Sequence, residues 1–264
     1  MSVRASFAKC YEFNLHAWQE ANSDTAFFWH PTLRGICEDL IVLNYIQGIP
    51  ADQREALMAG IMKHELNDGL KTQREFFSEC RPYQQVLGES VTPAQMEQIA
   101  DDIRRIWQGH GWPKMNRGVL PPVRQMAEKN GGDVLVALYD YLYRLTSRTV
   151  HFSVTGLLKT GWGNLPQVSF SPRNFSGYYT QFGRVYGAYM FCTFFELFAR
   201  ILRTDPKTKK LVGEIRSAVI GIPRWPEIVT FEEVNLEPPE IKVLEILAAV
   251  MDADRRRRLV RLKI

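Results

Sequence analysis

Apolar side chains recur every three to four residues along most of the chain, which is the spacing of amphipathic α-helices. Glycine and proline stop most of these apolar stretches. The pattern predicts helices over residues 5–21, 31–47, 52–80, 92–109, 122–130, 133 to beyond 151, 177–203, 206–217 and from 240 towards the C-terminus. We therefore expect an all-α protein, a single-domain multi-helix bundle with a core over about 25–205 and a C-terminal helix and basic tail over 240–264.

The start of the fourth helix has the clearest local signal. In T-P-A-Q, Thr92 can cap the helix, Pro93 suits its first turn and Gln95 completes a capping box. Residues 161–176 are instead rich in Gly, Pro, Ser and Asn, which predicts a loop with a short strand at 167–171. A proline-rich connection follows at 223–239.

Composition is that of a globular protein with a sizeable core, since 45% of residues are hydrophobic and 12% are aromatic. The formal net charge of +4 is unevenly spread. The last ten residues hold six Lys or Arg and no acid, which leaves 27 basic and 29 acidic residues, or −2, in the rest. Any attraction for nucleic acid must therefore come from a local patch or from this tail.

Several features indicate a cytoplasmic protein. The four cysteines are scattered without CxxC spacing, which argues for a reducing compartment. Lys9 and Glu12 interrupt the region where a signal peptide needs an apolar run. The most apolar window, 185–202, is broken by Glu196 and Arg200, so we expect no membrane span.

The segment from Tyr139 to His151 carries the strongest candidate chemistry. On a helix, Arg144, Ser147, Arg148 and His151 share one stripe, at about 0°, −60°, +40° and −20°. A cation, a hydroxyl and a side chain that titrates near neutral pH suit a phosphate-gripping or RNA-cleaving site. The same residues also suit an ordinary solvated helix face, in which Asp140 and Arg144 pair at i, i+4.

Two further charge pairs have the same spacing inside apolar helices. They are Arg34 with Glu38, and Glu196 with Arg200. Buried charges are costly unless they are paired, so such pairs favour a functional site. The alternative is a structural salt-bridge network that holds three helices together.

No metal or cofactor is expected. His64 and Asp68 have a spacing that can hold a metal, but a third ligand cannot be named, and a polar surface patch is the simpler interpretation. The chain has no Walker A motif, no dinucleotide-binding glycine motif after a strand and no nucleophile elbow.

Three sequence blocks occur in order: L-R-G-I-C-E-D-L-I-V-L-N-Y-I, W-P-K-M-N-R-G-V-L-P-P-V-R-Q-M-A-E-K and Y-D-Y-L-Y-R-L-T-S-R-T-V-H-F-S. Over roughly Pro31 to Ser153 they resemble an uncharacterised family of bacterial all-helical proteins of unknown function. That family is similar to the HEPN superfamily, helical bundles of toxins and antiphage defence systems, many of them dimeric, metal-independent endoribonucleases. Their motif is an Arg, four to six residues and a His. Arg144 and His151 fit it, whereas Leu145 departs from the polar residue that usually follows the Arg.

This resemblance implies an HEPN-like core with additional helices and a defence or toxin function. It implies RNA cleavage by 2′-hydroxyl transesterification, with His151 as general acid or base and Arg144 stabilising charge on the phosphate. The substrate-binding residues would be Ser147, Arg148, Arg34, Glu38 and Tyr143. The implied partners are RNA, a protein such as an antitoxin and a second copy in a homodimer. The alternative is a non-catalytic helical module that binds a protein partner or a nucleotide.

Overall fold

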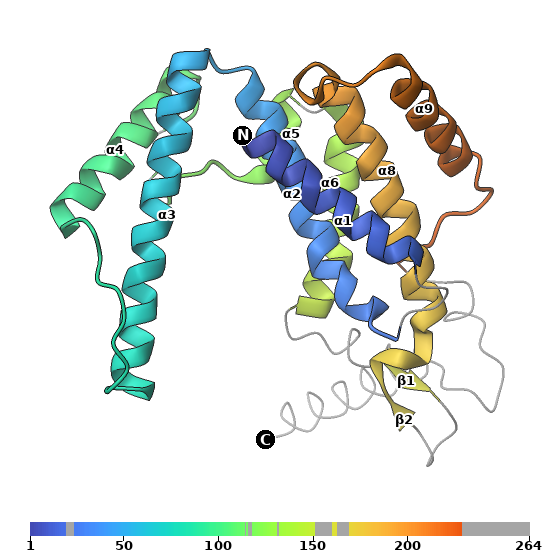
Figure 1. Ribbon diagram of the computed structural model, residues 1–264, viewed down its shortest axis with the longest axis horizontal. Helices are drawn as coiled ribbons and strands as arrows, with labels where there is room; N and C mark the ends of the chain where they lie inside the picture. Colours follow the sequence, from blue (N-terminus) through green and yellow to red (C-terminus); the bar gives the residue numbers. More distant parts are fainter. Residues whose placement is uncertain are drawn as a thin grey trace, which may run out of the picture. The chain divides into compact units, whose positions relative to one another are not determined.

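A computed structural model describes residues 1–19, 24–113, 115, 118–130, 132–150, 160–162 and 169–228 (Figure 1). Within these ranges the chain forms eight α-helices, two short 3₁₀-helices and one two-stranded sheet. The described part is therefore all-α, as the apolar spacing predicts. The helix expected from residue 240 and the basic tail lie outside the described residues.

The fold consists of two compact units. One comprises Met1–Leu40 and Ala137–Ile264, and the other comprises Ile41–Val136. The division passes through two helices, α2 (Trp29–Gln47) and α6 (Gly132–Val150). The first unit thus contains the N-terminal part of α2 and most of α6, where the candidate functional residues lie.

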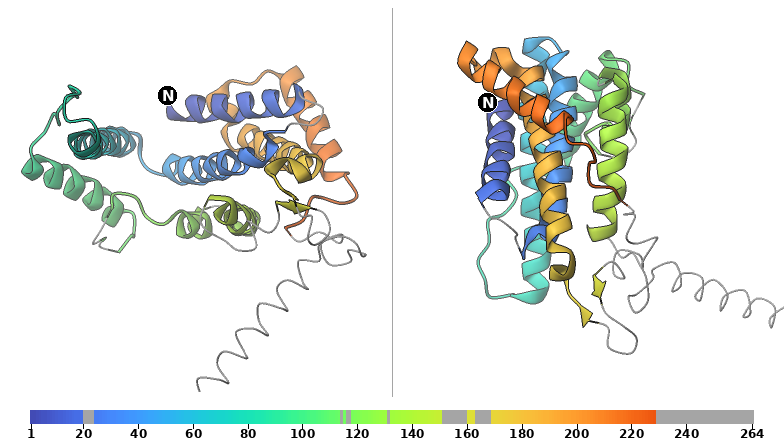
Figure 2. Two further views of the ribbon diagram at one scale, coloured as in Figure 1. Left: turned by 90° about the horizontal axis from the view of Figure 1, so that it is seen from below. Right: turned by 90° about the vertical axis from the view of Figure 1, so that its right-hand side faces the viewer.

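Helix α8 (Ser176–Leu202) forms the centre of the first unit. Helices α1 (Ser2–Gln19) and α9 (Pro206–Ile220) both pack against it (Figures 1 and 2). The contact with α1 requires a glycine, because a Cβ atom on Gly187 would lie 2.7 Å from Cε1 of Phe13. The absence of a side chain at Gly187 therefore sets how closely α1 and α8 approach.

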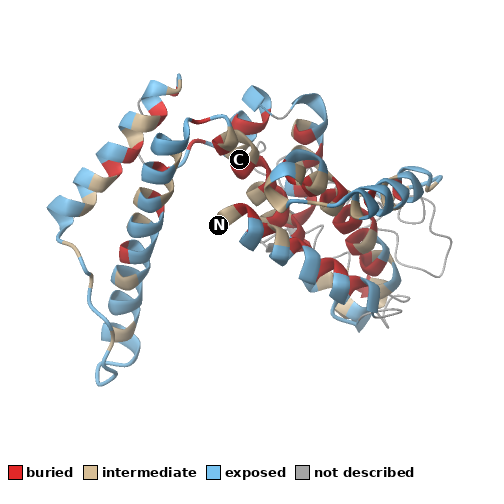
Figure 3. Ribbon diagram, turned by 45° about the horizontal axis from the view of Figure 1, so that its top comes forward, coloured by how far each residue is buried: buried red, intermediate tan, exposed pale blue. Residues whose placement is uncertain are grey.

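Aromatic side chains fill much of the core of this unit. Phe182, Phe194 and Phe198 of α8 are almost fully buried, and buried residues gather on the inner sides of the helices (Figure 3). A Cβ atom on Gly183 would lie 2.6 Å from the Trp29 ring, so α2 also packs closely on α8. Most of the large side chains of α8 are thus used for packing.

Short elements connect the helices of the first unit. They are the 3₁₀-helices η1 (Ala26–Phe28) and η2 (Pro172–Phe175) and the antiparallel strands β1 (Gly161–Trp162) and β2 (Ser169–Phe170). The strand expected near 167–171 is present at β2. Its partner β1 falls in a stretch expected to be loop.

The second unit contains the paired helices α3 (Ala51–Cys80) and α4 (Pro93–Gly109), followed by α5 (Val123–Asn130). Helices α3 and α4 pack closely, because a Cβ atom on Gly60 would lie 2.9 Å from the Ile103 side chain. This glycine therefore sets the spacing of the pair.

The capping box of α4 is confirmed. The Thr92 hydroxyl accepts a hydrogen bond from the Gln95 amide at 3.3 Å, and the Gln95 side chain accepts one from the Thr92 amide at 2.8 Å. Helix α2 begins at Trp29, two residues before the expected start, which places Pro31 in its first turn. Proline is tolerated there because the first amides of a helix have no intrahelical acceptor.

One described segment, Pro172–Leu202, is long and apolar enough to cross a membrane by length and composition. The protein itself buries 44% of the apolar window in this segment. A core helix meets the same criteria, so length and composition do not distinguish the two roles.

Candidate functional site

The candidate site begins with α6, whose two sides differ in character. Leu135, Leu138, Leu142 and Leu145 are buried, whereas Arg144 is exposed on the other side. The helix spacing that predicts a polar stripe opposite an apolar face is therefore confirmed for the described part of α6. Leu145, the residue that follows Arg144, is only 4% exposed and belongs to the core.

Arg34 and Glu38 form the expected ion pair on α2. The distance from Nε of Arg34 to Oε1 of Glu38 is 2.8 Å, and their side chains are 24% and 30% exposed. The expectation that this pair is buried is therefore wrong, since both side chains reach the surface. Partial burial alone would lower the pKa of Arg34, but the hydrogen bond and charge of Glu38 outweigh it and raise the pKa. Arg34 is consequently a permanent cation.

Arg34 also connects α2 to α6 through aromatic contacts. Its guanidinium carbon lies 4.4 Å from the centroid of the Tyr143 ring, within the range of cation–π attraction. The Tyr143 and Tyr139 rings lie 5.5 Å apart. Burial raises the pKa of Tyr139, and the nearby carboxylate of Glu38 adds to the rise, so Tyr139 stays a neutral phenol at physiological pH.

This arrangement, which we call the α2–α6 cluster, comprises Arg34, Glu38, Tyr139 and Tyr143. Arg34 uses only its Nε–H group in a hydrogen bond within the described part of the chain. Glu38 and Tyr143 fix the guanidinium plane, while the four N–H groups of the two terminal nitrogens have no described acceptor. A fixed guanidinium with free N–H groups can form a two-point contact with a phosphate or carboxylate.

Arg144 and Ser147 lie beside this cluster on α6. Arg144 is exposed and makes no ion pair with a described residue, so its expected pairing with Asp140 is wrong. Ser147 continues the row of Tyr139 and Tyr143 at i+4 spacing. Its Oγ is buried without a hydrogen-bond partner among the described residues. Arg34 therefore contacts this row at Tyr143, and Arg144 is the next residue along α6.

Two predicted site residues cannot be placed. His151 lies outside the described residues, and Arg148 is described only by its backbone in α6. The structure thus brings together Arg34, Glu38 and Tyr143, with the exposed Arg144 and the partly buried Ser147 next to them on α6. That Arg144 and His151 lie on one helix face and act together stays a prediction.

The expected pair of Glu196 with Arg200 does not form. Glu196 of α8 instead contacts Arg216 of α9, and both Glu196 and Arg200 are exposed rather than buried. Phe198 lies between them with non-helical backbone angles (φ −119°, ψ 16°), and this kink disturbs the i, i+4 geometry. This pair is therefore a surface contact between α8 and α9.

Other candidate polar residues do not assemble into a site. Among the described residues, no group of three His, Cys, Asp or Glu is placed to hold a metal ion. His110 is 2.8 Å from the side-chain oxygen of Gln53, which accounts for one of its ring nitrogens. The sequence did not single out Tyr139, although its i, i+4 spacing to Tyr143 was a usable signal.

A family of unknown function, DUF5677, matches residues 29–163, which is 135 of the 264 residues. The match begins at the first residue of α2 and covers every residue of the α2–α6 cluster. It confirms that the three sequence blocks belong to an uncharacterised family. No curated protein and no solved structure matches the chain.

Proposed function

Because the chain belongs to the DUF5677 family, whose function is unknown, we propose a function from its residues: an HEPN-like, metal-independent endoribonuclease of a bacterial defence or toxin system. The observation that carries the proposal is the Arg34 guanidinium, which Glu38 and Tyr143 hold while its terminal N–H groups bind no residue in the described part of the chain. In this orientation the guanidinium can donate two hydrogen bonds to an RNA phosphate beside the exposed Arg144.

In the proposed reaction, the RNA 2′-hydroxyl attacks the adjacent phosphorus and the bond to the 5′ oxygen breaks. The products are a 2′,3′-cyclic phosphate and a free 5′-hydroxyl. His151 takes the 2′ proton or gives one to the leaving oxygen, and Arg144 stabilises negative charge on the phosphate. Arg34 orients that phosphate, and Ser147 and Arg148 contact the substrate. The enzyme acts in the cytoplasm, where two copies pair and an antitoxin protein restrains them.

The test is cleavage of end-labelled single-stranded RNA in the presence of a metal chelator. We expect the wild-type protein to form cyclic phosphate ends, and we expect His151→Ala and Arg144→Ala to lose at least a hundredfold in rate. His64→Ala on α3 and Arg105→Ala on α4 are matched controls that should retain full activity, since both lie in the second unit. Undiminished cleavage by His151→Ala would rule out its catalytic role.

A second candidate function is a non-catalytic helical module that binds a protein partner or a nucleotide. Leu145 favours it, because the position after Arg144 is buried in the core and supplies no polar group. This alternative predicts no RNase activity in the purified protein and loss of partner or nucleotide binding in Arg34→Ala or Glu38→Ala. Cleavage by the wild-type protein would exclude it.

A further inference from the structure

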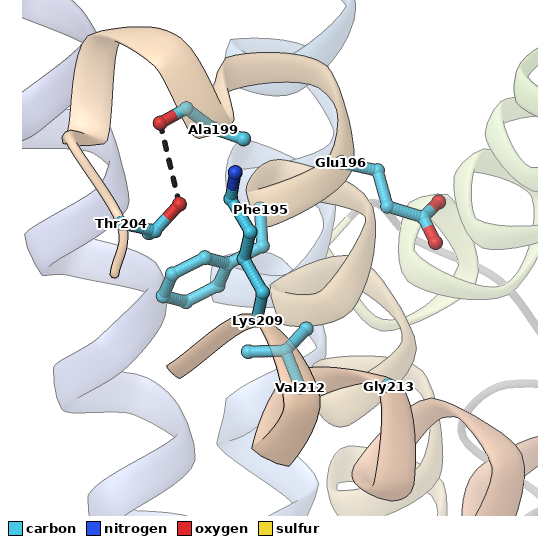
Figure 4. A pocket seen from close by; sticks show the side chains of 7 residues that line it. All are labelled: Phe195, Glu196, Ala199, Thr204, Lys209, Val212 and Gly213. Atoms are coloured by element: carbon cyan, nitrogen blue, oxygen red, sulfur yellow. Dashed lines mark hydrogen bonds between the residues drawn. The ribbon is translucent and has the colours of Figure 1, made fainter. Parts of the chain in front are cut away.

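A second potential binding surface lies between α8 and α9, away from the residues of the α2–α6 cluster. A pocket of about 240 Å³ opens there (Figure 4). It is lined by Phe195, Glu196, Ala199, Thr204, Lys209, Val212 and Gly213. Its volume lies below the range of about 300–1,000 Å³ typical of drug-sized ligands, so it suits a single planar ring system. We call it the α8–α9 pocket.

The apolar part of the pocket contains a fixed aromatic ring. Phe195 packs edge-on against Phe7 at 4.9 Å and against Phe191 at 5.0 Å between ring centroids. These neighbours hold the ring in place, and Val212 beside it is only 8% exposed. A ring fixed in this way can receive a stacked base without further loss of side-chain freedom.

The polypeptide turn above the pocket is also fixed. The carbonyl oxygen of Ala199 accepts hydrogen bonds from the amides of Arg203 and Thr204 and from the Thr204 hydroxyl at 3.3 Å. Arg203 has a left-handed backbone (φ 54°), a conformation that is unfavourable for a residue with a side chain and favours glycine. The chain nevertheless places a cation at this turn.

Lys209 is the cation that lines the pocket, and further cations lie close to it in the sequence. Arg200, Arg203, Lys207 and Lys209 make no ion pair with a described residue. The nearby acids are mostly paired, because Glu196 contacts Arg216 and Glu214 lies 3.9 Å from Lys210. From Ala199 to Lys209 the chain carries these four cations and one acid, Asp205, which caps α9, so this segment has a net charge of +3.

The side-chain directions place the positive charge of Lys209 beside the Phe195 ring. In Figure 4 the Lys209 side chain runs past the Phe195 ring, whereas the Glu196 carboxylate points away from it. An aromatic platform with cations at its edge is the combination that single-stranded nucleic acids require, since the bases stack and the phosphates need neutralising.

We propose that the α8–α9 pocket binds one unpaired base of a single-stranded RNA on Phe195, with the flanking phosphates on Lys209 and Arg203. The identification of RNA rests on the proposed function. The pocket would anchor the strand outside the cleavage site, so that it adds to substrate affinity and not to the chemical step.

The experiment measures binding of a fluorescent single-stranded RNA to the full-length protein carrying His151→Ala, which prevents cleavage during the titration. Lys209→Glu should weaken RNA binding about tenfold or more. It should also reduce the slope of log affinity against log salt concentration by about one, because one phosphate contact is lost. Lys210→Glu is the matched control, because this neighbouring lysine does not line the pocket. It should change affinity less than Lys209→Glu does.

A second variant tests stacking. Phe195→Leu keeps an apolar side chain but removes the ring, and it should weaken RNA binding at least fivefold. Thermal unfolding of both variants checks that they fold. If Phe195→Leu does not fold, Lys209→Glu decides the matter, since Lys209 is exposed.

The outcomes separate this inference from the proposed function. RNA binding that neither variant weakens overturns the pocket, even if wild-type cleavage supports the nuclease. Weakened binding without any wild-type cleavage supports the pocket and contradicts the nuclease. Absence of RNA binding contradicts the proposed binding role of the pocket. The same conclusion follows if the protein binds uridine monophosphate as tightly as it binds the RNA strand.

Discussion

Mutation of the ion pair of Arg34 and Glu38 measures how much the α2–α6 cluster contributes to the free energy of unfolding. Their side chains are 24% and 30% exposed, so the pair is intermediate between a fully exposed and a fully buried ion pair. A surface pair contributes about 0.2–1 kcal/mol, and an exposed cation–π contact adds about 0.5–1 kcal/mol. Truncating Arg34 to Ala should therefore cost about 1–2 kcal/mol, and truncating Glu38 to Ala about 1 kcal/mol or less.

The assay is a double-mutant cycle of Arg34→Ala and Glu38→Ala, followed by chemical unfolding. We expect a coupling energy of about 1 kcal/mol at most, smaller in 1 M salt because the pair is partly solvated. Lys210 and Glu214 on α9 are the matched control, since they have the same i, i+4 spacing in the same unit and are 81% and 61% exposed. Their coupling should be close to zero.

A coupling above about 3 kcal/mol would refute this reasoning, because a partly exposed pair cannot supply it. Such a value would mean that the pair of Arg34 and Glu38 is a major contribution to the stability of α2. The companion variant Arg34→Lys keeps the charge but loses the planar fork. If the cluster binds phosphate as proposed, Arg34→Lys should lose RNA affinity while retaining most of the stability.

Two further predictions concern packing and thiol chemistry. Gly187→Ala should destabilise the protein by about 1–3 kcal/mol in urea unfolding, because its Cβ would meet Phe13 at 2.7 Å. Gly213→Ala, where a Cβ meets nothing within 4 Å, should be neutral or stabilising, and equal losses in both would contradict the role of the α1–α8 contact. Burial raises the pKa of the Cys10 and Cys37 thiols to about 12, so at pH 8 they should stay protonated and unreactive. Exposed Cys80 should react first with a thiol reagent, and rapid modification of Cys37 would contradict this assignment.

The sequence predicts best those features that depend on neighbours along the chain. The capping box at Thr92 and Gln95 forms as expected, because its two hydrogen bonds join residues three apart. The pair of Arg34 and Glu38 also forms, since an uninterrupted helix places them one turn apart. In both cases the local backbone is regular, and regular backbone makes spacing informative.

The failures arise where the backbone is irregular or a distant segment competes. Glu196 contacts Arg216, twenty residues further along the chain, because α9 packs on α8 next to the kink at Phe198. The spacing of residues within α8 alone cannot predict a contact with α9. Likewise, the contact between Arg34 and Tyr143 depends on how α2 and α6 pack, so the sequence could name both residues but not their cation–π geometry.

The burial of Leu145 limits how α6 can act on a phosphate. A polar side chain at that position would face the core and lose its hydration, so Arg144 cannot gain a polar neighbour from the next residue. Tyr143 and Ser147 lie on the other side of Arg144, and Arg34 lies over the Tyr143 ring. In the proposed nuclease, Arg34 of α2 therefore supplies the second contact to the phosphate, because position 145 of α6 offers no polar group.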